Sequence, residues 1–271
     1  MPSTLWEPDG KRWVATELSR GPWDPRHCNG GPVAALLARL VETVEDDYSA
    51  DVDWHVARLT AELIHAVPVN RPLRVRSSVE RAGHHVSLIS VAIADDDQDL
   101  ALARGLRIRH SEAPVPAGTV QLDDHLPAPL DAPVTPTGLP ATDGATFLSD
   151  AITFRLIDGR LDELGATTAW IHLDVDVVPG NAPTGLQRVA AVSDTGNGLS
   201  SGLPHSEWLF MNADLSVHLA RPVVGEWIAL AAASTYGGEP VLSGSGIAEA
   251  TLYDEHGRLG RSMQSLYVEH R

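Results

Sequence analysis

The sequence lacks the features that mark disulfide-bonded, membrane-spanning and secreted proteins. Cys28 is the only cysteine among 271 residues, which excludes an internal disulfide and any metal site built from several cysteines. No apolar run reaches the ~18 residues that a membrane-spanning helix needs. The first residues also lack the basic start and apolar core of a signal peptide, so a cytoplasmic protein is expected.

Positive charge is also scarce. The chain has 20 Lys and Arg against 36 Asp and Glu, which gives a formal net charge of −16. Its long-range field repels phosphates, so neither nucleic acid nor an anionic membrane is expected as a partner. A small anionic ligand stays compatible, because a few local arginines and helix N-termini can hold one phosphate group. The histidines show no metal-ligand spacing, and no metal or other cofactor is expected.

The first half predicts one buried helix followed by four strands. Asn29 or Gly30 can cap a helix whose first turn contains Pro32 and whose positions up to Val41 are apolar nearly all round. Short separators between the strand-like runs indicate antiparallel neighbours. These strands are expected at 58–67, 73–81, 86–94 and 100–109, with a further short one at 13–18.

A proline-rich stretch separates the two halves. Residues 111–143 contain prolines and aspartates at a density that blocks regular structure, which predicts a surface linker. The pattern then restarts, with a helix expected at 183–192. The strands expected around it are at 151–156, 167–178, 211–219, 226–234, 241–253 and 259–269. We therefore divide the chain into an N-terminal unit (1–110), a linker (111–148) and a C-terminal unit (149–271).

The order of elements and turns is repeated in the two units, although their identity is low. Residues 65–73 match residues 219–227: in each, a strand ends, a proline turn follows at Pro68 or Pro222, and the next strand begins. A fixed period of this kind indicates a duplicated unit. Each unit is interpreted as one apolar helix packed on one antiparallel sheet, an arrangement that buries both apolar faces.

Two segments resemble acyl-CoA thioesterase II and its thioesterase-like relatives: the helix start at 30–37 and the run at 212–222. The likeness is strongest from Trp208 to Arg271, which includes Arg221-Pro222 and the turn at 253–257. The resemblance implies an α+β double hotdog fold, in which two tandem units each wrap an antiparallel sheet around a central helix. It also implies a hydrolase that uses water directly to split an acyl-CoA thioester. Exposed sheet edges further predict a homo-oligomer.

The resemblance also suggests site residues. In that family an aspartate, a threonine and a glutamine of the second hotdog hold and activate the attacking water. These places fall on Asp214, Thr235 and Gln264, with Ser234 one step from the threonine. A carboxylate can accept the proton if partial burial raises its pKa. Threonine and glutamine side chains can each fix a water by hydrogen bonds.

The glycine helix start of the first hotdog falls on Gly30 and Gly31. Amide groups at a helix start can stabilise an oxyanion, and the missing Cβ atoms let a carbonyl approach closely. Asp194 is a competing aspartate near the end of the second predicted helix, where some single-hotdog thioesterases carry their catalytic acid. It ranks second, because the glycine-rich run after it indicates that the helix is already ending. Arg221 is interpreted either as structural or as a contact to the coenzyme A phosphates.

Other functions stay open beside hydrolysis. A dehydratase or hydratase acting on acyl thioesters would need a histidine paired with a carboxylate, for which His27 and His55 are candidates. A non-catalytic acyl-binding protein would need neither. Cys28 precedes a helix start that could activate a thiol, and residues 198–202 fit a nucleophile-elbow pattern without its strand and helix context. The first half has Thr60 where the second has Asp214, which predicts one active site per chain.

Overall fold

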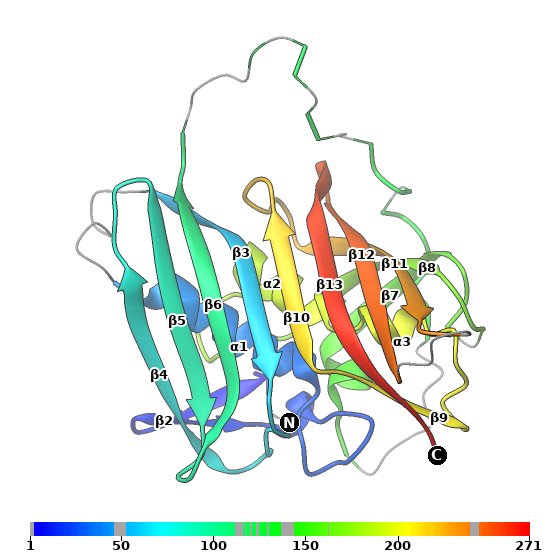
Figure 1. Ribbon diagram of the computed structural model, residues 1–271, viewed down its shortest axis with the longest axis horizontal. Helices are drawn as coiled ribbons and strands as arrows, with labels where there is room; N and C mark the ends of the chain where they lie inside the picture. Colours follow the sequence, from blue (N-terminus) through cyan, green and yellow to red (C-terminus); the bar gives the residue numbers. More distant parts are fainter. Residues whose placement is uncertain are drawn as a thin grey trace.

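The computed structural model describes residues 3–45, 53–111, 116, 118–119, 121–122, 125–128, 130–136, 144–161, 163–238 and 244–271. Within these residues, 13 strands form one antiparallel sheet, and the helices lie together on one of its faces (Figure 1). The first unit contains β1 (Trp6–Asp9), β2 (Arg12–Ala15), α1 (Gly30–Thr43), β3 (Trp54–Leu63), β4 (Pro72–Arg81), β5 (Val86–Ala94) and β6 (Asp99–Arg109).

The second unit repeats this order with additions. It contains β7 (Ile152–Asp158), β8 (Thr167–Leu173), α2 (Gly185–Ser193), α3 (Gly196–Leu199), β9 (Trp208–Asn212), β10 (Asp214–Leu219), β11 (Trp227–Tyr236), β12 (Ser245–Asp254) and β13 (Gly257–His270). The strand order is β1-β2-β4-β5-β6-β3-β10-β13-β12-β11-β8-β7, with β9 also paired to β13. The architecture is therefore of the α+β class, as predicted.

The ladder between β3 and β10 joins the two units at the centre of the sheet. Its register is symmetric about the pair Ala61 and Leu215: Thr60 pairs with Ser216, and Glu62 pairs with Asp214. If the units are superposed so that Ala61 falls on Leu215, Thr60 falls on Asp214 and Glu62 falls on Ser216. Exchanging the two halves therefore leaves the pairing unchanged, and the repeat in the sequence is also a repeat in space.

Several strands end earlier than the sequence predicts because their last residues pair elsewhere. The strand expected to reach 178 ends at Leu173, and the amide of Leu5 donates to the carbonyl of Asp176 at 2.9 Å. The strand expected to reach 67 ends at Leu63, since the carbonyl of Val67 accepts from the amide of Cys28. The strand expected at 211–219 is two strands, with a break at Ala213. The strand expected to begin at 241 is β12 from Ser245, with residues 239–243 outside the described part.

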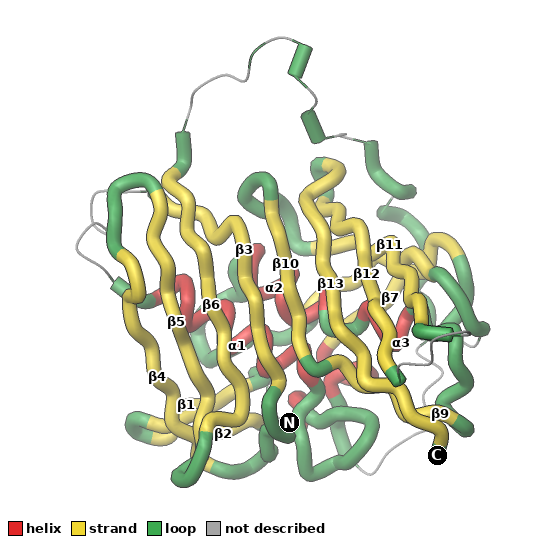
Figure 2. The backbone as a smooth tube through the Cα atoms, viewed as in Figure 1, coloured by secondary structure: helices red, strands yellow, loops and turns green. Residues whose placement is uncertain are grey.

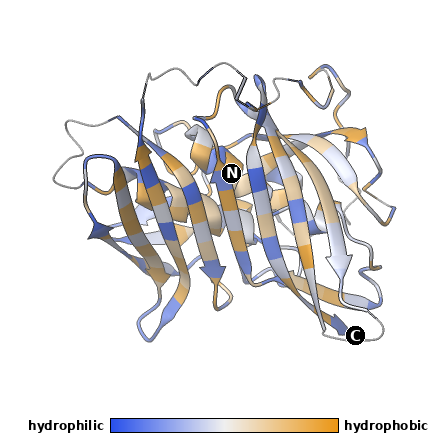
Figure 3. Cartoon of the chain, turned by 45° about the horizontal axis from the view of Figure 1, so that its top comes forward, coloured by the Kyte–Doolittle hydropathy of each residue, from blue (hydrophilic) through white to orange (hydrophobic). Residues whose placement is uncertain are grey.

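The core lies between the sheet and the two long helices, which are drawn behind the strands in Figure 2. α1 packs against β3, β5 and β6, α2 packs against β8, β10 and β11, and the helices pack against each other. Leu36, Leu37 and Val189 are fully buried there, each stabilising the fold by about 1.5–3 kcal/mol. Along the strands, apolar and polar residues alternate in colour in Figure 3, as expected when one face is covered.

α1 and α2 run antiparallel. The side chain of Thr184, which caps the start of α2, donates to Glu42 near the end of α1 at 2.8 Å. At the other end of the pair, the start of α1 touches the end of α2, where a Cβ built on Gly31 would lie 2.4 Å from the carbonyl oxygen of Ala191. None of the described helices has the length and apolar character to cross a membrane.

Candidate active site

A buried carboxyl group lies where the start of α1 meets the end of α2. Asp194 is the residue that ends α2, and it is only 4% exposed. The side chain of Asn29 caps α1 by accepting from the amide of Gly31 at 3.0 Å. A Cβ built on Gly30 would lie 2.4 Å from Oδ1 of Asp194, which no real Cβ can do. Glycine at this position is therefore what lets the carboxyl group reach the first turn of α1.

Two donors hold the Asp194 carboxyl group. Nδ2 of Asn212, the last residue of β9, donates to Oδ1 at 2.7 Å, and the amide of Gly31 is the second donor. Burial raises the pKa of Asp194 to about 6, although these hydrogen bonds lower it. This residue can therefore take up and release a proton near neutral pH, which a catalytic base needs.

Gln264 on β13 closes the same cluster from the sheet. Its neighbours Met263 and Ser265 are exposed, whereas Gln264 is 2% exposed and points toward the helix layer. Its Nε2 donates to the backbone carbonyl of Asp194 at 3.1 Å, and its Oε1 accepts from the amide of Asn197 at 3.1 Å. Gln264 therefore fixes the segment that carries the carboxyl group relative to the sheet.

The structure brings together only some of the predicted site residues. Gly30, Gly31, Gln264 and the second-ranked Asp194 form the cluster, whereas Asp214 accepts from the backbone amide of Ser265. Asp214 is the first residue of β10, after the break at Ala213. Its carboxylate is therefore bound by the backbone of the neighbouring strand β13.

The predicted threonine and its neighbour also lie outside the cluster. Thr235 is exposed on β11, and the hydroxyl of Ser234 lies 2.8 Å from that of Ser200. The sequence does not predict Asn212 as a site residue. Its one signal is its position, two residues before Asp214 in the run that carries the resemblance.

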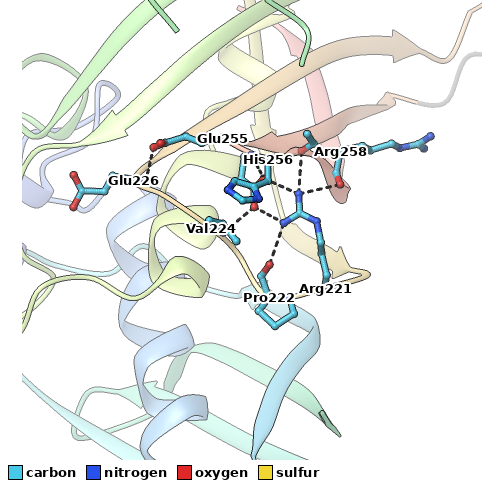
Figure 4. Close-up of polar contacts among 9 residues, drawn as sticks. Arg221, Pro222, Val224, Glu226, Glu255, His256 and Arg258 are labelled. Carbon is cyan, nitrogen blue, oxygen red and sulfur yellow. Dashed lines mark hydrogen bonds and ion pairs between the residues drawn. The ribbon is translucent and has the colours of Figure 1, made fainter. Parts of the chain in front are cut away.

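Arg221 binds residues of the turn after β10 and of the β12–β13 turn (Figure 4). Its Nη1 and Nη2 donate to the two carboxylate oxygens of Asp254 at 2.5 and 2.6 Å, and further bonds reach the carbonyls of Pro222, Gly257 and Arg258. Burial alone would raise the pKa of Asp254, but the bonds from Arg221 and two amides outweigh it and hold this pKa below its ordinary value. Of the two interpretations of Arg221, the geometry favours the structural one.

We expect Arg221→Gln to lower the free energy of unfolding by about 3 kcal/mol, because it leaves the Asp254 carboxylate buried without its cation. Urea denaturation followed by circular dichroism would measure this. Arg76→Gln is a matched control, since Arg76 also binds a carboxylate, that of Asp99, but with its side chain 64% exposed, where a pair contributes less than about 1 kcal/mol. Equal losses in the two variants would contradict the structural role.

The residues considered for other chemistries have partners or environments that do not suit those roles. His27 faces Asp24, with Nδ1 3.4 Å from Oδ2, and burial lowers the pKa of His55 on β3. Burial also raises the pKa of the Cys28 thiol, which opposes the formation of a thiolate nucleophile. The hydroxyl of Ser200 donates to the carbonyl of Gly196 at 2.8 Å, and Ser200 follows the short helix α3 instead of forming a strand-to-helix elbow. Among the described residues, no group of three or more His, Cys, Asp or Glu side chains could hold a metal ion.

Comparison with protein families gives two adjacent matches. Residues 19–108 match the family described as the acyl-CoA thioesterase N-terminal domain, and residues 123–268 match the one described as the acyl-CoA thioesterase C-terminal domain. No curated protein matches the sequence.

Solved structures resemble the chain over nearly its whole length. A hot dog fold protein from Alicyclobacillus acidocaldarius has a TM-score of 0.72 at 14% identity, covering 98% of this chain and 96% of its own. The acyl-CoA thioesterase II TesB2 from Mycobacterium marinum has a TM-score of 0.66 at 15% identity, covering 99% and 96%. The tesB protein of Mycobacterium avium subs paratuberculosis has a TM-score of 0.65 at 15% identity, covering 98% and 97%. These likenesses confirm the predicted double hotdog fold.

Proposed function

Because the chain belongs to the acyl-CoA thioesterase family, with both family domains in one polypeptide, we propose that it hydrolyses an acyl-CoA thioester to a free acid and coenzyme A. The observation that carries the proposal is the Asp194 carboxyl group. It is buried against the first turn of α1, and its pKa is raised to about 6. A proton acceptor thus lies beside amide groups that can stabilise an oxyanion, and thioester hydrolysis needs both.

In this mechanism Asp194 is the general base. Asn212 holds Oδ1 of the carboxylate through Nδ2, and its own carbonyl oxygen can accept a hydrogen bond from the attacking water. As the water oxygen bonds to the thioester carbon, its proton passes to Asp194. The carbon–sulfur bond then breaks, and the proton returns to the departing thiolate.

The first turn of α1 provides the oxyanion site in this proposal. The Gly31 amide already donates to Asn29, and Pro32 has no N–H, so the remaining amides of this turn and the positive end of the helix dipole would stabilise the oxyanion. Gly30 and Gly31 let this turn approach the end of α2 closely, since a Cβ on either would lie 2.4 Å from Asp194 or Ala191. Gln264 is a positioning residue that fixes the backbone at Asp194. In this proposal Asp194, and not Asp214, is the base, and Asn212, and not Thr235, holds the water.

Hydrolysis fits the described contacts better than dehydration does. A dehydratase needs an imidazole in the reacting cluster, whereas the described partners of the Asp194 side chain are Asn212 and Gly31. The test is thiol release from acyl-CoAs of increasing chain length, followed with a colorimetric thiol reagent. Binding by calorimetry without thiol release at any chain length would contradict hydrolysis and favour an acyl-binding protein.

We expect kcat/KM to fall on the acid side with a midpoint near pH 6. Asp194 must be ionised to accept a proton, and burial raises its pKa to about 6. The activity is therefore present above that pH and decreases about tenfold per pH unit below it. Thiol release measured from pH 4.5 to 8, with circular dichroism confirming the fold at each pH, would test this. A midpoint near 4, the ordinary value for an aspartate, would exclude Asp194 as the base.

A further inference from the structure

A basic cavity lies beside the start of α1. Its volume is about 480 Å³, and it is formed by the loop before α1 and the turn after β3. Its lining residues are Arg20, Pro25, Arg26, His27, Pro68, Val69, Asn70 and Arg71. Three arginines and no carboxylate line it, although the chain as a whole has a net charge of −16. Positive side chains therefore outnumber negative ones among the lining residues, which favours an anionic ligand.

Backbone hydrogen bonds join the two walls of the cavity. The amide of Cys28 donates to the carbonyl of Val67 at 2.8 Å, and the amide of Val69 donates to the carbonyl of Arg26 at 3.0 Å. Asn70 adopts a left-handed conformation, with φ of 57°, and its amide donates to the carbonyl of Ala15 at 2.8 Å. The walls are therefore fixed before any ligand binds, which lowers the entropic cost of binding.

Arg71 is the arginine of this cavity that is most available to a ligand. Arg26 donates to both carboxylate oxygens of Asp24, and Arg20 pairs with Glu17 at 2.9 Å. Arg71 is exposed and makes no hydrogen bond or close ion pair with a described residue, although its charge contributes to lowering the pKa of Asp95. An exposed guanidinium can bind a phosphate through two parallel hydrogen bonds.

A second cavity of similar size is a weaker candidate for an anion. It has a volume of about 450 Å³ and contains Lys11 and three arginines, but Asp97 and Asp99 also line it. Its three arginines already face carboxylates, since Arg76 binds both oxygens of Asp99, Arg12 lies 3.1 Å from Asp96, and Arg74 lies 3.8 Å from Asp96. A phosphate there would meet carboxylates as well as cations.

We propose that the basic cavity binds phosphate groups of coenzyme A, while the pantetheine arm follows residues 27–31 to the glycines at the start of α1. This inference rests on the proposed function and names the part of the substrate that is recognised. His27 precedes Gly30 by three positions, so their Cα atoms lie at most about 11 Å apart. The cavity is thus near the reacting carbon but separate from it, as the phosphates are from the sulfur in coenzyme A.

Arg71→Gln should raise KM for an acyl-CoA about tenfold with little change in kcat. It should not affect the N-acetylcysteamine thioester of the same acid, which keeps the acyl group and the thioester but has no phosphate. Arg74→Gln, in the second cavity, is the matched control and should behave like the parent with both substrates. In the parent, KM for the acyl-CoA should rise with salt, because screening weakens exposed charge interactions.

Two outcomes would overturn the proposal: an unchanged KM for the acyl-CoA in Arg71→Gln, or an equal loss with both substrates. Calorimetry with coenzyme A itself separates this inference from the proposed function. If the parent hydrolyses neither substrate but binds coenzyme A, and Arg71→Gln weakens that binding about tenfold, the proposed function fails and the cavity assignment stands. If Arg71→Gln and the parent bind coenzyme A equally well, the cavity assignment fails.

Discussion

Replacing Asp194 with asparagine should lower kcat by about 100- to 10,000-fold, the range for loss of a general base. Asparagine keeps the size of the side chain and can still accept from Asn212, which donates to Oδ1 at 2.7 Å, but it cannot take a proton from water. Thiol release from the best acyl-CoA substrate measures the effect. Asp214→Asn is the matched control, since it changes another aspartate of the same unit whose carboxylate accepts from the sheet amide of Ser265. If only Asp214→Asn lost activity, Asp214 and not Asp194 would be the base.

Above pH 6, Asp194→Asn should be more stable than the parent protein. The pKa of Asp194 in the folded protein is about 6, above its ordinary value of 3.8, so folding becomes less favourable as pH rises through this range. The difference corresponds to at most about 3 kcal/mol at pH 8, which Asp194→Asn should recover, while the two proteins should differ less at pH 4. A variant that is inactive and also less stable at pH 8 would indicate a structural role for Asp194.

Gly30→Ala should reduce kcat by about 100-fold, the effect of displacing a catalytic group by about 1 Å. The new Cβ would lie 2.4 Å from Oδ1 and 2.8 Å from Cγ of Asp194, so the carboxyl group must move away from the first turn of α1. Steady-state kinetics with one acyl-CoA would separate the fall in kcat from any change in KM, and a thermal melt would show whether the fold is kept.

Gly198→Ala provides the comparison for Gly30→Ala. Gly198 lies in α3 close to the same cluster, but a Cβ built on it meets no heavy atom within 4 Å. This variant should keep the activity of the parent. If Gly30→Ala were folded and as active as Gly198→Ala, the contact between the glycine and the carboxyl group would have no role in catalysis.

The local pattern of the sequence predicts the main elements well, because the long strands and both long helices are apolar or alternating runs between turn residues. The pattern fails where a partner is distant in sequence. Leu5 and Asp176 pair across the two units, and nothing in either segment indicates the other. The break at Ala213 lies inside an alternating apolar and polar run, so the sequence predicts the end of β9 and all of β10 as one strand.

Distant contacts also explain which site residues the sequence could indicate. Gly30, Gly31 and Gln264 carry local signals, since a glycine pair at a helix start and a glutamine on a strand are both unusual. Asp194 was ranked below Asp214 because the residues after it indicate the end of a helix. The helix does end there, and that is why the residue can reach the start of α1. Only the antiparallel packing of α1 and α2 brings Asp194 to the start of α1, and local sequence does not encode that packing.

The symmetric ladder between β3 and β10 also has a consequence for how the protein assembles. Its central pair, Ala61 and Leu215, would be an interface between subunits if the two units were separate chains, and the sheet would then come apart on dilution. In one polypeptide the pairing is intramolecular, with an effective concentration that a flexible connection can bring to about the millimolar range. The cost is kinetic, because this ladder closes a loop of more than half the chain, and non-local strand pairing folds slowly. The protein should therefore refold slowly, at a rate that does not depend on its concentration.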